Sequence, residues 1–178
     1  MNLWHDIEPG EEDAMNVIIE TPRGSHNKYE IDKKTGLLKL DRVNYNAAPY
    51  PFEYGFIPQT YWEDGDALDV MVLSTFPLFP GALLTVRPVA LMEMTDSGDP
   101  DNKIIGVPVN DRRWDDVRDV EDLNQHSLKE FKHFFETLKQ LKEKPATITV
   151  HGFKGKADAI AAFKESLELY KKEFPQKA

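Results

Sequence analysis

The sequence feature that most constrains the fold is the kind of hydrophobic periodicity along the chain. Through the first two thirds, short apolar or alternating segments are separated by Pro and Gly, whereas helical periodicity appears only in the last third. Closely spaced turn residues favour a closed or curled sheet over strand–helix–strand units. We therefore expect a mainly β (α+β) fold: a small closed β-barrel with two C-terminal helices packed outside.

The expected strands are short, and one of them carries a proline. Pro88 lies inside the longest candidate strand and indicates an edge position or a bulge there. Residues 50–55 contain Pro51 and Gly55 and are expected to form a loop. The candidate strands are residues 17–19, 28–31, 37–43, 70–73, 83–94, 103–107 and 147–150.

Two helices are expected after residue 126. Ser127 and Glu130 have the spacing of a capping box, with Ser127 as the N-cap. One apolar stripe follows, which could also serve packing between subunits through Phe134 or Phe135. The stripe consists of Leu128, Phe131, Phe134, Phe135, Leu138 and Leu141. The second helix is expected over residues 157–174, with its inward face formed by Ile160, Phe163, Leu167, Tyr170 and Phe174.

Composition narrows the class of protein. The chain has 178 residues, a net charge of −9 and no cysteine, which predicts one domain over residues 1–178 and excludes disulfides, thiolate metal sites and cysteine nucleophiles. A net negative charge argues against nucleic acid as a partner. The N-terminus has no signal-peptide pattern, and no apolar run approaches the length of a membrane span. We expect a soluble, cytoplasmic protein without membrane partners.

The densest chemical signal is a run of carboxylates between Trp62 and Val70. Asp64, Asp66 and Asp69 lie within six residues, with Gly65 allowing a tight loop between the first two. Carboxylates this close repel each other, and a cation with several oxygen ligands removes that cost. Oxygen ligands without cysteine indicate Mg²⁺, Mn²⁺ or Ca²⁺ rather than zinc. A solvated turn explains the run about equally well.

Other charged and phenolic residues gain meaning only if they converge with this run. Asp96, Asp99 and Asp101 follow the longest strand and are expected at a hairpin tip, where a solvated turn is the better explanation for them alone. Taken one at a time, the remaining charged candidates are explained by surface ion pairs and the phenolic ones by aromatic packing. Together, these groups would suit a metal-bound polyphosphate. The remaining candidates are Lys28, Glu30, Arg42, Tyr50 and Tyr54.

Known nucleotide and hydrolase motifs are absent, but the ordered set of motifs resembles a family. The chain contains no P-loop, GxGxxG, GxSxG or HExxH pattern. It resembles the soluble family I inorganic pyrophosphatases, bacterial type, over almost its whole length. The segments that carry the resemblance are residues 17–20, 28–32, 41–42, 50–51, 54–55, 64–70, 80–81, 94–96, 101–103 and 133–136. The resemblance implies an OB-like barrel, Mg²⁺-dependent hydrolysis of pyrophosphate to two phosphates, with Mn²⁺ as an alternative metal, and a homo-hexamer.

The resemblance also implies a role for each site residue. Asp66 would be the general base for a water that bridges two metals. The implied metal ligands are Asp64, Asp69 and Asp101 at the tighter sites, Asp96 with Asp101 at a further site, and Glu30 through water. The implied phosphate-binding residues are Lys28, Arg42, Tyr54, Lys103 and Lys139. Glu20 would belong to the same acidic floor, and Tyr50 would be a supporting phenol.

Two departures from the family pattern leave alternatives open. Ala67 stands where the family usually has Pro, and Leu138 stands where it usually has Tyr before Lys139. Leu138 cannot donate a hydrogen bond to phosphate, so a catalytically weak, hexameric scaffold that binds phosphate or metal is the second hypothesis. An oligonucleotide-binding barrel is a third reading by fold analogy alone, and the charge of −9 counts against it.

Overall fold

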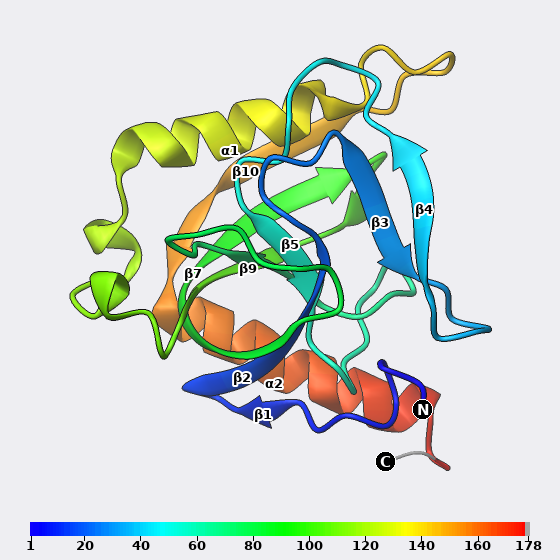
Figure 1. The fold of residues 1–178 in the computed structure, drawn as a ribbon, viewed down its shortest axis with the longest axis vertical. Coiled ribbons are helices and arrows are strands. Elements are labelled where there is room, and N and C mark those ends of the chain that lie inside the picture. Colours follow the sequence, from blue (N-terminus) through cyan, green and yellow to red (C-terminus); the bar gives the residue numbers. More distant parts are fainter. Residues whose placement is uncertain (177–178) are drawn as a thin grey trace.

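A closed ring of strands forms the centre of the molecule in the computed structural model, which describes residues 1–176 (Figure 1). A further pairing, between β2 and β7, joins the first and last strands of the ring. The prediction of a small closed β-barrel is therefore confirmed. The ring runs in the order β2 (Ala14–Thr21), β5 (Glu53–Phe56), β6 (Asp69–Val72), β9 (Lys103–Pro108) and β7 (Leu83–Asp96).

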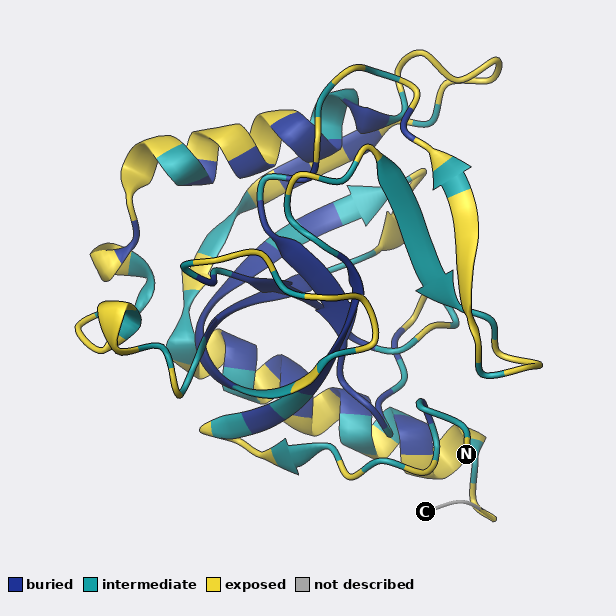
Figure 2. Ribbon diagram, viewed as in Figure 1, coloured by how far each residue is buried: buried dark blue, intermediate teal, exposed yellow. Residues whose placement is uncertain are grey.

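Shorter strands extend the ring, and one hairpin stands apart from it. β3 (Asn27–Ile31) and β4 (Leu38–Val43) form a separate two-stranded sheet at one side of the ring (Figure 1). We call residues 27–43 the site hairpin. The ring strands are mostly buried, whereas β4 is mostly exposed (Figure 2). The strands that extend the ring are β1 (Gly10–Glu11) beside β2, and β8 (Asp99–Pro100) and β10 (Ile148–Gly155) beside β7.

Two helices pack outside the ring, as predicted, and they cover opposite sides of it (Figure 1). α1 (Gln125–Leu138) packs Phe131, Phe134 and Phe135 against Phe52 at the start of the β5 region. α2 (Lys156–Glu173) places small and aromatic side chains against a second core that includes β2 and β6 residues. Single 3-10 turns occupy Arg112–Trp114 and Val120–Asp122. Within residues 1–176, no helix combines the length and apolar character needed to cross a bilayer.

The strand predictions are confirmed in outline, with one correction. The pairing register of β7 with β9 shifts between Pro88 and Ala90, so of the two expected alternatives, an edge position or a bulge, the structure shows the bulge. The loop expected at residues 50–55 is wrong in its second half, because Glu53 to Phe56 form β5. Gly55 is needed there for close strand contact, since a Cβ atom would lie 2.0 Å from the Ile18 carbonyl oxygen.

The start of α1 and the end of its apolar stripe differ from the prediction. The N-cap is Asn124, whose side-chain oxygen accepts from the backbone N–H groups of His126 and Ser127 at 2.9 and 3.1 Å, so Ser127 lies inside the helix. Leu141 lies beyond the helix end and is 70% exposed. Phe134 and Phe135 are buried in the core of their own chain, so the proposed packing between subunits through them is wrong.

Candidate active site

A cavity of about 490 Å³ lies between the ring and the site hairpin. The two acidic segments, residues 64–69 and 96–101, both contribute side chains to it, although they are far apart in the sequence. Every side chain to which the sequence assigned a site role lines this cavity. These are Glu20, Lys28, Glu30, Arg42, Tyr50, Tyr54, Asp64, Asp66, Asp69, Asp96, Asp101, Lys103 and Lys139.

The floor of the cavity depends on the parallel pairing of β6 with β9. Asp69 and Lys103 are the first residues of these strands and are register partners, so the fold places them side by side. The Lys103 ammonium is 2% exposed, donates to Asp69 Oδ2 at 2.7 Å and forms a second ion pair with Asp101. Burial opposes the charge on Lys103, but the carboxylates of Asp69 and Asp101 outweigh it and raise its pKa.

Two buried phenols adjoin this floor. Tyr54, on β5, donates its hydroxyl hydrogen to Asp69 Oδ2 at 2.5 Å. Burial, with the nearby Asp69 charge, raises the pKa of Tyr54 well above its usual value, so the phenol remains a donor. Tyr50 packs beside it with 5.9 Å between ring centroids, and burial raises the pKa of Tyr50 as well.

The carboxylate loop, residues 62–69, turns at Gly65. Gly65 has φ of +88°, a conformation that side-chain-bearing residues rarely adopt, and the backbone N–H of Asp66 donates to Asp64 Oδ1 at 3.1 Å. Burial and the charges of Asp69 and Asp101 raise the pKa of Asp64 to about 6. Asp66 is 56% exposed and forms an ion pair with Lys33 of the site hairpin.

The second acidic segment is a hairpin tip, as predicted. β7 pairs with β8 across Ser97 and Gly98, which both have positive φ, and this turn places Asp96 at the cavity. Lys139, directly after α1, forms an ion pair with Asp96. Burial opposes ionisation of Asp96, but the Lys139 ammonium outweighs it and lowers the pKa of that carboxyl.

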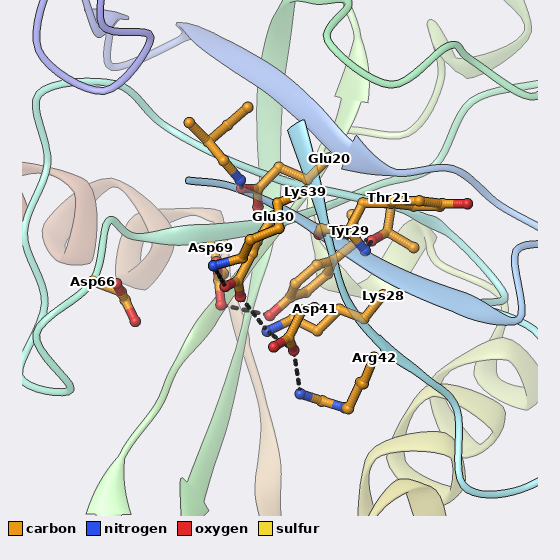
Figure 3. Close-up of polar contacts among 12 residues, drawn as sticks. Glu20, Thr21, Lys28, Tyr29, Glu30, Lys39, Asp41, Arg42, Asp66 and Asp69 are labelled. Carbon is orange, nitrogen blue, oxygen red and sulfur yellow. Dashed lines mark hydrogen bonds and ion pairs between the residues drawn. The ribbon is translucent and has the colours of Figure 1, made fainter. Parts of the chain in front are cut away.

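The site hairpin presents alternating acids and cations to the cavity (Figure 3). Lys28 lies between two carboxylates, at 3.5 Å from Glu30 and 3.6 Å from Asp41. Arg42 donates to Asp41 at 2.7 Å, and its Nε hydrogen has no hydrogen-bond partner within residues 1–176. These cations therefore have donor capacity left for an anion in the cavity.

Glu20 attaches the site hairpin to the ring. It lies near the end of β2, is 8% exposed, and accepts the backbone N–H of Ile31 at 2.6 Å. Burial raises the pKa of Glu20 to about 8, despite that hydrogen bond, and the Asp69 charge acts in the same direction. This carboxyl therefore keeps its proton at neutral pH when no cation neutralises the cavity.

Leu138, which stands where the family usually has Tyr, lies at the boundary between the core and the cavity. Leu138 is 3% exposed, belongs to the core cluster beneath α1 and also lines the cavity. It packs, as its place in the apolar stripe predicted, and it supplies the cavity wall with no donor. The adjacent Lys139 still reaches the site.

The sequence reasoning missed several cavity residues that carry cations or an aromatic ring. Lys33 and Lys34 directly follow Asp32 after β3, and Lys39 lies on β4 at 3.3 Å from Glu30. Trp4 comes from the N-terminal segment, and the Lys33 ammonium is 5.2 Å from its ring centroid. The alternation of Lys39 with Asp41 along one strand was the available signal for Lys39; Trp4 had none.

The donor chemistry of the cavity fits hard divalent cations. Six aspartates and two glutamates line it, and the sequence has no cysteine to favour a softer metal. Within residues 1–176, however, no three carboxylate or imidazole groups are gathered as a ready-made metal site. Lysines occupy the carboxylates instead: Lys33 at Asp66, Lys103 at Asp69 and Asp101, and Lys139 at Asp96.

Comparisons with known proteins give one consistent family match. The family model described as "Inorganic pyrophosphatase" matches residues 17–171. The chain is 43% identical over 174 residues to an inorganic pyrophosphatase of Picrophilus torridus, covering 97% of each chain. It is 45% identical over 169 residues to a soluble inorganic pyrophosphatase of Oryza sativa subsp. indica, covering 94% of this chain and 78% of the relative.

Solved structures of inorganic pyrophosphatases match the fold of the chain as well as its sequence. The crystal structure of inorganic pyrophosphatase from Thermus thermophilus matches with a TM-score of 0.91 and 41% identity, covering 95% of this chain and 99% of that one. This match confirms the predicted OB-like barrel with outer helices. Because the family match spans most of the sequence and relatives above 40% identity cover nearly all of it, the chain belongs to the inorganic pyrophosphatase family.

Proposed function

We propose that the chain hydrolyses inorganic pyrophosphate to two phosphates, with Mg²⁺ as the working metal, Mn²⁺ as an alternative, and Asp66 as the general base. One observation carries the proposal: two acidic segments distant in the sequence meet buried and half-buried cations in one cavity. Carboxylates alone would repel a diphosphate. A site that bound the diphosphate through lysine and arginine alone would have no need of carboxylates. A cavity with both suits a polyanion that arrives with divalent cations.

The residues that would hold the metals are the carboxylates of the cavity. Asp64, Asp69 and Asp101 would bind the tighter metals, Asp96 would share a further one with Asp101, and Glu30 would act through water. Bound divalent cations supply charge neutralisation for the phosphate oxygens and acidify a nearby water.

The protein side chains supply proton transfer, charge neutralisation and a hydrogen-bond donor. Asp66, exposed on the carboxylate loop, accepts the proton of the water that attacks one phosphorus in line. The cations of the cavity neutralise the phosphate oxygens as the bridging P–O bond breaks, so positioning and electrostatics supply most of the acceleration. Tyr54 keeps its proton, which it donates to Asp69 when no metal is bound and would donate to phosphate once Asp69 binds a metal. The cations are Lys28, Arg42, Lys103 and Lys139.

The reaction is tested by phosphate release from pyrophosphate. We expect release with Mg²⁺ and none with EDTA. Leu138 has no donor for phosphate, so weak affinity is compatible with the proposal, but negligible release at every Mg²⁺ concentration would favour the scaffold hypothesis instead.

The general base is tested by Asp66→Asn. This variant keeps the loop shape and should lower turnover by about 10²–10⁴-fold while Mn²⁺ binding, measured by equilibrium dialysis, stays largely intact. Asp99→Asn is the matched control, because Asp99 is an exposed acid of the β7–β8 hairpin and does not line the cavity. Equal turnover in the Asp66→Asn variant and the control would remove the assignment of the base.

We also propose that the protein works as a homo-hexamer in the cytoplasm, without nucleic-acid or membrane partners. The hexamer is inferred from the family resemblance and is compatible with two exposed aromatic residues, Phe76 at 67% and Phe79 at 85% exposure, in the segment between β6 and β7. Light scattering on the purified chain tests it, and a monomer mass at micromolar concentration would rule it out.

A further inference from the structure

Three proposed metal ligands and the proposed general base already have cationic partners. Lys103 bridges Asp69 and Asp101, Lys139 pairs with Asp96, and Lys33 pairs with Asp66. Lys103 and Lys139 are among the expected phosphate ligands. Lys33 has no such assignment, and it contacts the residue proposed as the general base.

The surroundings of Lys33 place its ammonium beside Asp66 without burying it. The ammonium pairs with Asp66, lies 3.4 Å from the Gly65 carbonyl oxygen and lies 5.2 Å from the centroid of the Trp4 ring. These three contacts come from the carboxylate loop and the N-terminal segment. Lys33 itself belongs to the site hairpin, so its side chain links three segments of the chain at the cavity edge.

The same contacts leave Lys33 free to move. Its side chain is 57% exposed and that of Asp66 is 56% exposed. Both groups are therefore largely hydrated already, and separating them costs little free energy. The four-carbon stem lets the ammonium swing while the backbone stays in place. Divalent cations held by Asp64 and Asp69, which flank Asp66 in the carboxylate loop, would repel this ammonium and separate the pair.

We propose that Lys33 is a positioning residue that occupies Asp66 until divalent cations enter, and that the displaced ammonium then contributes to binding of the diphosphate. Lys33 therefore opposes metal binding and favours anion binding, which couples the two events. The inference rests on the proposed function of the site, because it assumes that metal and diphosphate meet there.

The coupling predicts opposite effects of one substitution. Lys33→Gln should tighten Mn²⁺ binding in the absence of anion by about two- to fivefold, the range expected for loss of one exposed competing pair. In saturating Mn²⁺, it should weaken binding of methylenediphosphonate, a diphosphate that cannot be hydrolysed, by a similar factor. Titration calorimetry measures both affinities without turnover.

Lys34→Gln is the matched control. Lys34 is the next residue, lines the same cavity and carries the same charge, but the described residues 1–176 provide it with no ion pair to a carboxylate. The inference requires Lys33→Gln to exceed Lys34→Gln in both titrations, and Lys33→Arg to behave like the unsubstituted chain. Equal shifts in Lys33→Gln and Lys34→Gln would mean a general charge effect and would overturn the inference, as would weaker metal binding or unchanged diphosphonate binding in Lys33→Gln.

This test is separate from that of the proposed function. Both titrations use the metal and a non-hydrolysable anion, so their outcome does not depend on phosphate release. Absence of pyrophosphate hydrolysis in the unsubstituted chain would defeat the proposed function, whereas active enzyme with no difference between the Lys33 and Lys34 variants would defeat only the role of Lys33.

Discussion

The floor of the cavity and the site hairpin hold their charged groups in opposite ways. On the floor, Lys103 is 2% exposed and is fixed between two carboxylates by the parallel pairing of β6 and β9. On the site hairpin, Lys28 is 24% and Lys39 is 50% exposed, and both lie more than 3 Å from their partners. The floor charges are therefore part of the folded core, whereas the hairpin charges are available to a ligand at little structural cost.

The largest loss of folding stability should follow Lys103→Met. Removing this buried ammonium leaves Asp69 and Asp101 without their partner in a desolvated place, and breaking such a pair costs about 3–5 kcal/mol. Urea unfolding in EDTA measures the change. A loss below about 1 kcal/mol, the value typical of exposed pairs, would erase the distinction between the floor and the hairpin.

A second test concerns Glu20, which joins the two regions. Its pKa in the folded chain is about 8 against an ordinary 4.5, so in EDTA the unfolded chain loses this proton first as pH rises. The free energy of unfolding should therefore fall as pH rises from about 4.5 to about 8 and level off above that window. Glu20→Gln should remove most of this fall.

The control for Glu20→Gln is Glu165→Gln on the exposed face of α2. It should leave the pH dependence of unfolding unchanged. A fall with pH that persists undiminished in Glu20→Gln would assign it to another group of the cavity.

The smallest effect on stability is expected for Lys28→Gln on the site hairpin. Its two pairs, at 3.5 and 3.6 Å, are partly exposed, so the free energy of unfolding should change by less than about 1 kcal/mol. The KM for pyrophosphate with Mg²⁺ should nevertheless rise about tenfold or more, because a charged donor to phosphate is lost.

Lys154→Gln, which removes an exposed lysine on β10 outside the cavity, serves as the comparison. Stability losses of similar size for Lys28→Gln and Lys103→Met would contradict the proposed contrast. So would a KM that rises equally in Lys28→Gln and Lys154→Gln.

Secondary structure that follows local sequence patterns was predictable, whereas the exact ends of its elements were not. The barrel strands other than β5 and both helices were predictable, because period-two and period-3.6 patterns are local. The cap of α1 was misassigned because Asn124 and Ser127 both suit the role, and only the observed backbone selects Asn124. Leu141 continued the apolar stripe in sequence, but the helix ends at Leu138 before it can be buried.

The sequence by itself determined most of the charged and phenolic side chains of the cavity, because aspartates, lysines and tyrosines in this order are typical of one family. Tertiary structure alone decided how they are paired. Asp69 meets Lys103 because two distant strands run parallel, and Asp66 meets Lys33 because the site hairpin lies against the carboxylate loop. Local patterns specify strands and turns, whereas ion pairs and shifted pKa values depend on distances and burial that exist only after the chain has closed into a ring.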